Sequence, residues 1–149
     1  MMKVRKKSSL QIMLVGDSHV GKTSIMSQLS NRKFNSEYKT TIGGDFNVKD
    51  LLIDGQIVSL RIYDTMGDER HQSVGRDKRC PGIHIMHAGV IVYDLSKTQS
   101  FESISARRDE IIEHINIHCE NASEFPLFVV GNKMDFEYSV ESVEKHRHW

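Results

Sequence analysis

Short apolar runs recur along the chain, separated by longer polar or amphipathic segments. Such runs are typical of strands, and they predict strands at 10–15, 46–53, 57–63, 88–93 and 127–130. Asp54-Gly55 lies between the second and third runs and predicts a hairpin turn. The amphipathic segments predict helices at about 22–32, at about 99–118 and from about residue 139.

The second predicted helix carries one apolar stripe that would face the sheet. Its members recur at helical spacing and are Phe101, Ile104, Arg108, Ile111, Ile112 and Ile115. Strands that alternate with helices predict a doubly wound α/β sheet with helices on both faces. In such a sheet the ligand binds at the carboxyl ends of the strands.

The segment after the first predicted strand fits the phosphate-binding pattern G-x-x-x-x-G-K-[ST]. It reads Gly16-Asp17-Ser18-His19-Val20-Gly21-Lys22-Thr23, and a predicted helix follows it. The glycines let the backbone wrap around an anion, so that N–H groups and the helix N-terminus point at phosphate oxygens. We expect Lys22 to reach the β- and γ-phosphates and the Thr23 hydroxyl to bind Mg²⁺.

Two further motifs follow predicted strands. Asp64-Thr65-Met66-Gly67 has the form D-x-x-G, in which the aspartate holds the Mg²⁺ shell and the glycine N–H meets the γ-phosphate. Asn132-Lys133-Met134-Asp135 has the form N-K-x-D. Its aspartate would accept from N1–H and the N2 amine of guanine, whereas adenine offers neither donor there. A P-loop ATPase or kinase is therefore disfavoured, although N-K-x-D alone is also compatible with an ordinary turn.

Four segments in this order resemble the small GTPases of the Ras superfamily: GDSHVGKTS, YKTTIGGDF, LRIYDTMGDE and VVGNKMD. IGGDF with the third segment is similar to the Rab branch, and 31–41 with 72–75 is most similar to the late-endosomal Rab type. The similarity runs from about Leu10 to Trp149. It implies a P-loop GTPase sheet, GTP or GDP with Mg²⁺ as the bound cofactors, and a part in vesicle-mediated transport.

The resemblance also implies which residues form the site. Thr41 would join Thr23 and Asp64 as a metal ligand when GTP is bound, and Phe34 would lie against the guanine ring. The expected catalytic residues are Thr41, Gly67 and Asp68. The expected nucleotide contacts are Gly16, Asp17, Ser18, His19, Val20, Gly21, Lys22, Thr23, Ser24, Phe34, Thr41, Asp64, Gly67, Asn132, Lys133 and Asp135.

The chain departs from the family pattern at the residue that follows the D-x-x-G glycine. Family members carry Gln there, which orients the attacking water, and this chain carries Asp68. Its carboxylate has no N–H to donate and would be repelled by the phosphates, so we expect slow GTP hydrolysis. Met66 replaces a small alanine, and His19 stands where Rabs usually have glycine.

The resemblance implies exchange factors, GTPase-activating proteins and Rab effectors as partners. Rab effectors commonly contact an aromatic triad, of which this chain keeps Phe46 and has Tyr63 for the usual tryptophan. No third aromatic residue occurs around 83–86, and Cys80-Pro81-Gly82 predicts a broken helix in a lengthened segment. Partner choice is therefore expected to differ from the family.

Composition agrees with a single domain and gives no indication of a further ligand. Of 149 residues, 38% are hydrophobic, and 20 basic residues balance 20 acidic ones, so no net field favours nucleic acid. Two cysteines and the lack of an apolar signal core predict a cytoplasmic protein with reduced thiols. The resemblance to Rabs implies that it is peripheral to endomembranes through its partners. His71, Cys80, His84 and His87, or His114 with His118, have residue types found in zinc sites, but their spacing favours a solvated surface.

We expect residues 1–9 to be a basic tail and 10–149 to be a GTPase domain that is incomplete at its C-terminus. A complete Rab continues with a sixth strand, an S-A-K-like loop, a final helix and prenylated cysteines. None of these is found up to Trp149, so we expect no encoded lipid anchor. The sequence leaves open a non-catalytic, Rab-like interaction protein or short isoform that binds exchange factors or effectors without turnover.

Overall fold

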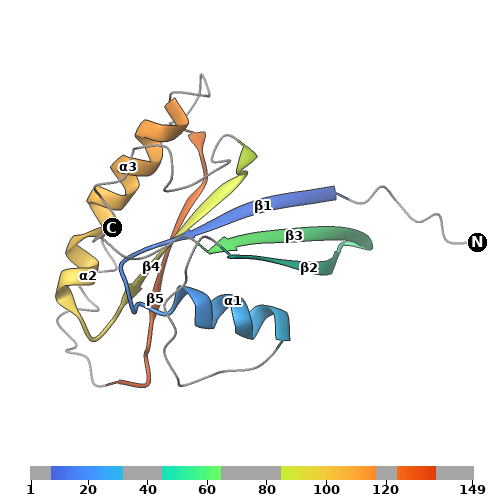
Figure 1. Cartoon of the computed structure of the whole chain (residues 1–149). Helices are drawn as coiled ribbons and strands as arrows, with labels where there is room; N and C mark the ends of the chain where they lie inside the picture. Colours follow the sequence, from blue (N-terminus) through green and yellow to red (C-terminus); the bar gives the residue numbers. More distant parts are fainter. Residues whose placement is uncertain (1–7, 32–44, 65–84, 117–123, 137–149) are drawn as a thin grey trace, which may run out of the picture.

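The computed structural model describes residues 8–31, 45–64, 85–116 and 124–136. Within these ranges five strands form one sheet in the spatial order β2-β3-β1-β4-β5 (Figure 1). The strands are β1 (Ser8–Val15), β2 (Asp45–Ile53), β3 (Gln56–Asp64), β4 (Ala88–Asp94) and β5 (Leu127–Asn132). Only the β2–β3 hairpin is antiparallel, and the other pairs are parallel. All five strands lie where the apolar runs predict them.

Helices cover both faces of the sheet, as predicted (Figure 1). On one face α1 (Lys22–Asn31) packs Met26 against Leu14 of β1 and Ile62 of β3. On the other face lie α2 (Thr98–Glu102) and α3 (Ile104–Asn116). A larger buried cluster joins α3 to β1 and β4 and consists of Met13, Val15, Ile91, Tyr93, Ile104, Ile111 and Ile115.

The helix predicted over 99–118 is divided at Ser103 into α2 and α3. The Ser103 hydroxyl lies 2.9 Å from the carbonyl oxygen of Ser100 and 2.8 Å from Oδ2 of Asp17. Side-chain bonds of this kind compete with regular helix geometry. The apolar stripe was also wrong at one position, because Arg108 points to solvent with 55% of its side chain exposed.

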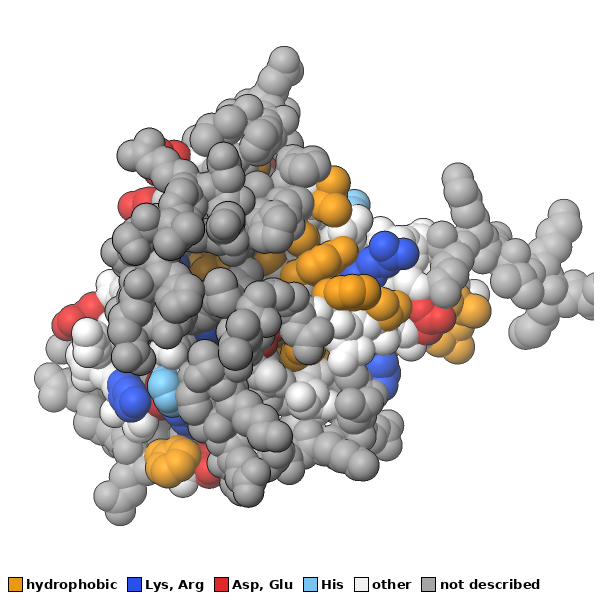
Figure 2. Space-filling view, in the orientation of Figure 1, with side chains coloured by type: hydrophobic (Ala, Val, Ile, Leu, Met, Phe, Trp, Pro, Cys, Tyr) orange, Lys and Arg blue, Asp and Glu red, His pale blue; other side chains and the backbone are white. Residues whose placement is uncertain are grey.

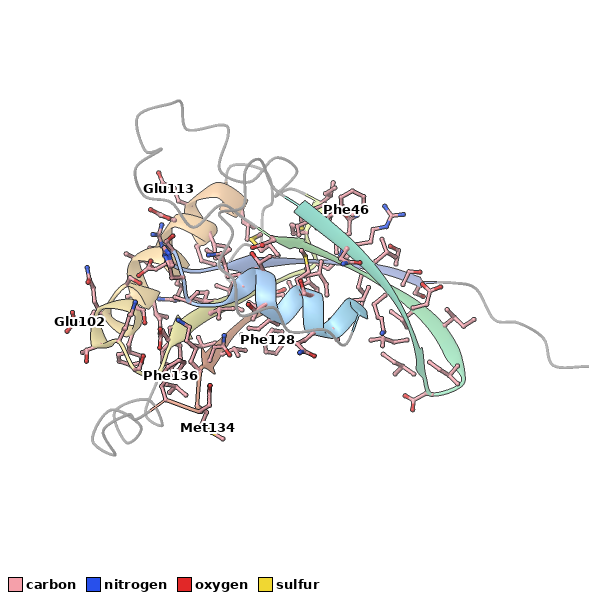
Figure 3. All side chains as sticks on the ribbon, turned by 60° about the horizontal axis from the view of Figure 1, so that its bottom comes forward. Phe46, Glu102, Glu113, Phe128, Met134 and Phe136 are labelled. Carbon is pink, nitrogen blue, oxygen red and sulfur yellow. The ribbon has the colours of Figure 1, made fainter. Side chains whose placement is uncertain are left out.

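Two parts of the sheet expose apolar side chains. The β2–β3 end carries exposed Phe46, Val48 and Leu52, and Figure 2 shows hydrophobic side chains gathered toward that end of the molecule. On β5, Phe128 is 57% exposed; it is labelled in Figure 3. No helix in the described ranges is long and apolar enough to cross a membrane. The helix predicted from about residue 139 lies outside these ranges.

Candidate nucleotide-binding site

The carboxyl ends of β1, β3 and β5 bring the three predicted motifs to one edge of the sheet. The phosphate loop leaves β1 at Gly16, which has φ +149°. A Cβ on Gly16 would lie 2.1 Å from the carbonyl oxygen of Val92 in β4. A Cβ on Gly21, where φ is +100°, would lie 2.2 Å from Nδ2 of Asn132. The two glycines are therefore required because the loop packs directly against β4 and against the N-K-x-D segment.

Lys22 is held inside the phosphate loop. It is 6% exposed, and Nζ donates to the carbonyl oxygens of Gly16 and Asp17, both at 2.8 Å. Burial lowers the pKa of Lys22, and the charge of Arg107 lowers it further, against the raising effects of Asp64 and Asp17. An ammonium group has three donors, so one donor remains beyond these two bonds for an anion at the loop. An incoming phosphate would favour the charged form.

Thr23 and Asp64 meet where a metal ligand pair was predicted. The Thr23 hydroxyl donates to Oδ2 of Asp64 at 2.5 Å. Asp64 is 2% exposed, and in the described part of the structure its Oδ1 accepts no hydrogen bond. A hydroxyl beside a carboxylate supplies hard oxygen ligands of the kind that Mg²⁺ prefers, so the donor set fits this ion.

The N-K-x-D segment is tied to the phosphate loop and to β4. Asn132 Nδ2 donates to the carbonyl oxygen of Val20 at 2.8 Å. Lys133 has φ +64° and donates from Nζ to Oδ2 of Asp94 at 2.7 Å. Asp135 follows at the exposed rim, next to Met134, which is 72% exposed (Figure 3).

Asp94, at the carboxyl end of β4, is 1% exposed. Its Oδ1 also accepts from the backbone N–H and hydroxyl of Ser96 at 3.0 and 2.6 Å. Burial raises the pKa of Asp94, but the bonds from Lys133 and Ser96 outweigh burial and leave the pKa below its ordinary value. Sequence reasoning missed this residue, although a charged side chain ending a buried strand was a usable signal.

The remaining predicted residues divide into two groups. Ser18 and Ser24 are half-buried in the loop and the first turn of α1, and His19 is exposed with φ +66°. Phe34, Thr41, Gly67 and Asp68 lie outside the described residues.

The alternative of a zinc site gains no support from the described residues, which contain no group of three or more potential metal ligands. His87 is exposed, and its Nδ1 accepts from the backbone N–H of Gln11 at 3.0 Å. His71, Cys80, His84 and His118 lie outside the described ranges.

The sheet, with its phosphate loop between β1 and α1, is the fold of a P-loop GTPase. The sequence pattern of the Ras family matches residues 11–148, and the relatives described next carry Rab-type names. The chain therefore belongs to the Ras family and, within it, to the Rab-type GTPases. The predicted resemblance is confirmed.

Three curated relatives illustrate the match. The chain is 41% identical over 150 residues to the Ypt/Rab-type GTPase avaA of Emericella nidulans, covering 98% of this chain and 68% of the relative. It is 41% identical over 147 residues to the Ypt/Rab-type GTPase ypt7 of Schizosaccharomyces pombe, covering 96% and 67%. It is 38% identical over 149 residues to the Ras-related protein Rab7 of Drosophila melanogaster, covering 97% and 67%.

Proposed function

We propose that this chain is a GTP/GDP-binding switch of membrane trafficking that binds guanine nucleotide with Mg²⁺ and hydrolyses GTP slowly. The observation that carries the proposal is the bond from Asn132 Nδ2 to Val20 O at 2.8 Å. It holds the base-reading segment against the phosphate loop, so one nucleotide can contact both. The Rab-type relatives support the assignment to trafficking.

The phosphate end of the nucleotide is assigned to the loop between β1 and α1. Lys22, already fixed by two carbonyl oxygens, donates to the β- and γ-phosphates, and the N–H groups of the loop and of Ser24 surround the same oxygens. Thr23 and Asp64 hold Mg²⁺, which when bound neutralises phosphate charge, and Thr41 completes the metal site in the GTP state.

The base end is assigned to Asp135, whose carboxylate accepts from N1–H and the N2 amine of guanine. The segment that carries it is anchored by Lys133 on buried Asp94. Phe34 is assigned to the face of the same ring. This anchoring keeps Asp135 at a constant distance from the phosphate loop.

Rab effectors, exchange factors and GTPase-activating proteins are the proposed partners, acting at endomembranes. The structure supports an effector surface on the β2–β3 hairpin. There Phe46 is 58% exposed and stacks on Tyr63, with ring centroids 5.8 Å apart. An exposed aromatic ring that is already stacked on a half-buried one is a typical anchor for a protein partner.

Guanine selectivity is tested by Asp135→Ala in titrations with fluorescent GDP and Mg²⁺. The variant loses the acceptor for two donors, and one lost charged hydrogen bond costs about 1.5–3 kcal/mol. GDP affinity should fall at least about tenfold, while Met134→Ala, at the exposed neighbouring position, serves as the matched control and should stay within about twofold of wild type.

A second variant tests the same contact by a gain of affinity for another nucleotide. Asp135→Asn replaces one acceptor by an amide donor, which suits xanthine because xanthine carries a carbonyl where guanine carries its amine. Xanthosine diphosphate should therefore displace the label from Asp135→Asn better than GDP does. Equal affinity of wild type for ATP and GTP, or no binding of either nucleotide, would contradict the proposed function and leave the non-catalytic interaction protein.

A further inference from the structure

An acidic residue occupies the second position of the phosphate loop, and its side chain turns to α3. Arg107 donates to Oδ1 of Asp17 from Nη2 at 3.0 Å and from Nε at 3.3 Å. Oδ2 of Asp17 lies 2.8 Å from the hydroxyl of Ser103. The side chains of Arg107 and Asp17 are only 19% and 15% exposed, so this ion pair is shielded from solvent on most sides.

The same residue fixes the phosphate-binding lysine. The carbonyl oxygen of Asp17 accepts from Lys22 Nζ, while its carboxylate accepts from Arg107. Any movement of Asp17 therefore moves one of the two oxygens that hold Lys22. The backbone of the loop and the side chain of α3 are joined through a single residue.

Helix α3, which carries Arg107, is firmly anchored in the core. Ile104 and Ile111 of α3 are 1% and 4% exposed within the main core cluster. The guanidinium of Arg107 also contacts Glu110, with Nη1 at 3.2 Å from Oε2 of Glu110. Burial lowers the pKa of Arg107, but the bonds and charges of Asp17 and Glu110 outweigh burial and raise it above its ordinary value. The guanidinium is a fixed positive charge at the edge of the loop.

A carboxylate in a loop that binds a polyanion opposes binding unless its charge is compensated. At about 4 Å and an effective dielectric of about 20, two unit charges interact strongly enough to change an equilibrium constant by more than a hundredfold. Arg107 compensates Asp17 at 3.0 Å.

Resting on the proposed function, we propose that Arg107 is a positioning residue for nucleotide binding. It neutralises Asp17 and fastens the phosphate loop to α3, and it thereby slows nucleotide release. Arg107 acts through Asp17 and does not itself touch the nucleotide.

The test is the release rate of fluorescent GDP from the Mg²⁺-loaded chain, chased with excess GDP. Arg107→Ala should release the label about tenfold faster than wild type, as expected for the loss of a partly buried charged contact in which two guanidinium donors share one carboxylate oxygen. Arg108→Ala is the matched control, because Arg108 is the next residue of α3, is 55% exposed and pairs only loosely with Asp109 at 3.7 Å. Its release rate should remain within about twofold of wild type.

The double variant Asp17→Asn/Arg107→Ala separates charge compensation from simple loss of packing. If Arg107 acts through Asp17, removing the carboxylate should restore at least part of the slow release that Arg107→Ala loses. Arg107→Lys keeps the charge without the planar fork, so it should fall between wild type and Arg107→Ala. Thermal unfolding of each GDP-loaded variant is recorded beside its release rate.

The outcomes separate the two proposals. If wild type does not bind fluorescent GDP, the proposed function fails and the role of Arg107 fails with it. If wild type binds and Arg107→Ala releases GDP no faster than Arg108→Ala, only the role of Arg107 is overturned. It is also overturned if Asp17→Asn speeds release further in the Arg107→Ala background. Should Arg107→Ala fail to fold, Arg107→Lys decides, and release equal to wild type overturns the role.

Discussion

His19 shows at the scale of one residue how the phosphate loop departs from the family pattern. It adopts φ +66°, a conformation that glycine reaches freely and that costs other residues about 1–2 kcal/mol. Its backbone still follows the loop, so the substitution adds an exposed imidazole and some strain without removing an N–H. Asp68 is a different kind of departure, because the side chain at this position is expected to take part in GTP hydrolysis.

Hydrolysis should respond to the residue at position 68 more than binding does. Asp68→Gln supplies an N–H donor and removes a negative charge, so single-turnover GTP hydrolysis should rise several-fold, with GTP affinity changed by less than about threefold. Wild-type turnover should lie below about 10⁻⁴ s⁻¹. The measurement is phosphate release from preloaded protein, with Asp68→Asn as the control that removes charge at constant length. A wild-type rate at or above that scale would mean that Asp68 orients water adequately.

At the scale of elements, polar contacts at the strand ends tie together loops that are distant in sequence. Asn132 links the end of β5 to the phosphate loop, and Lys133 links it to the end of β4. Ser100 of α2 donates to the carbonyl oxygen of Asp94 at 3.1 Å, so α2 joins the same network. The geometry of the site therefore depends on the strand ends as much as on the loops.

The buried Asp94–Lys133 pair predicts a specific dependence of stability on pH. The pKa of Asp94 is lowered in the folded state, so the unfolded chain binds its proton first as the pH falls. The stabilisation is complete above the ordinary value of 3.8 and is lost as the pH falls through the lower, folded value. Asp94→Asn should lower the free energy of unfolding by about 1.5–3 kcal/mol at neutral pH, and this difference should shrink below about pH 4.

Urea unfolding at a fixed GDP concentration, from about pH 7 to pH 3, measures this difference. Asp109→Asn is the control, because Asp109 has 74% of its side chain exposed. Its difference from wild type should be small at every pH. If the difference in the free energy of unfolding between wild type and Asp94→Asn stayed constant across this pH range, the lowered pKa of Asp94 would be contradicted.

The sequence predicted the elements better than it predicted their connections. Apolar runs located all five strands, and in the interior strand β4 nearly the whole run is buried, as expected for a parallel strand that is covered on both faces. The helix spacing of Phe101 and Ile104 runs unbroken across Ser103, so no local pattern could reveal that α2 and α3 are separate. The break is associated with Asp17, 86 residues earlier in the chain. Arg107 was missed for the same reason, since its partner is distant in sequence.

The whole molecule is assembled around a site to which three strands contribute. Thr23 and Asp64 lie side by side, as their motifs led us to expect, and the two loop glycines pack against Val92 and Asn132, which no motif predicted. The nucleotide, metal and catalytic roles of all predicted site residues remain predictions, including those of Phe34, Thr41, Gly67 and Asp68, as do the limits of the domain at 10–149. A ligand that joins loops from β1, β3 and β5 should stabilise the entire sheet, since it binds only when all three are in place.

Nucleotide and metal should therefore raise the melting temperature together. At a free GDP concentration about 100 times Kd, the stabilisation is about 2.7 kcal/mol, which raises Tm by about 5–10 °C for a chain of this length. EDTA should remove most of the increase, because Thr23 and Asp64 then hold no ion beside the phosphates. Calorimetry with GDP, with GDP and EDTA, and with ADP as the control measures these shifts. An equal shift with ADP, or none on chelation, would contradict the assigned base and metal contacts.

The central place of β1 has a consequence for biosynthesis. β1 leaves the ribosome first, yet its neighbours in the sheet are β3 and β4, and its loop is closed by Asn132 of β5. At roughly 5–20 residues per second, about 5–22 s pass between translation of Thr23, which completes the phosphate loop, and translation of Asn132. Throughout that interval the nascent chain carries a complete phosphate-loop sequence that cannot yet retain a nucleotide. Under the proposed function, loading with guanine nucleotide is thus a late event in the synthesis of each new molecule, because it waits for Asn132.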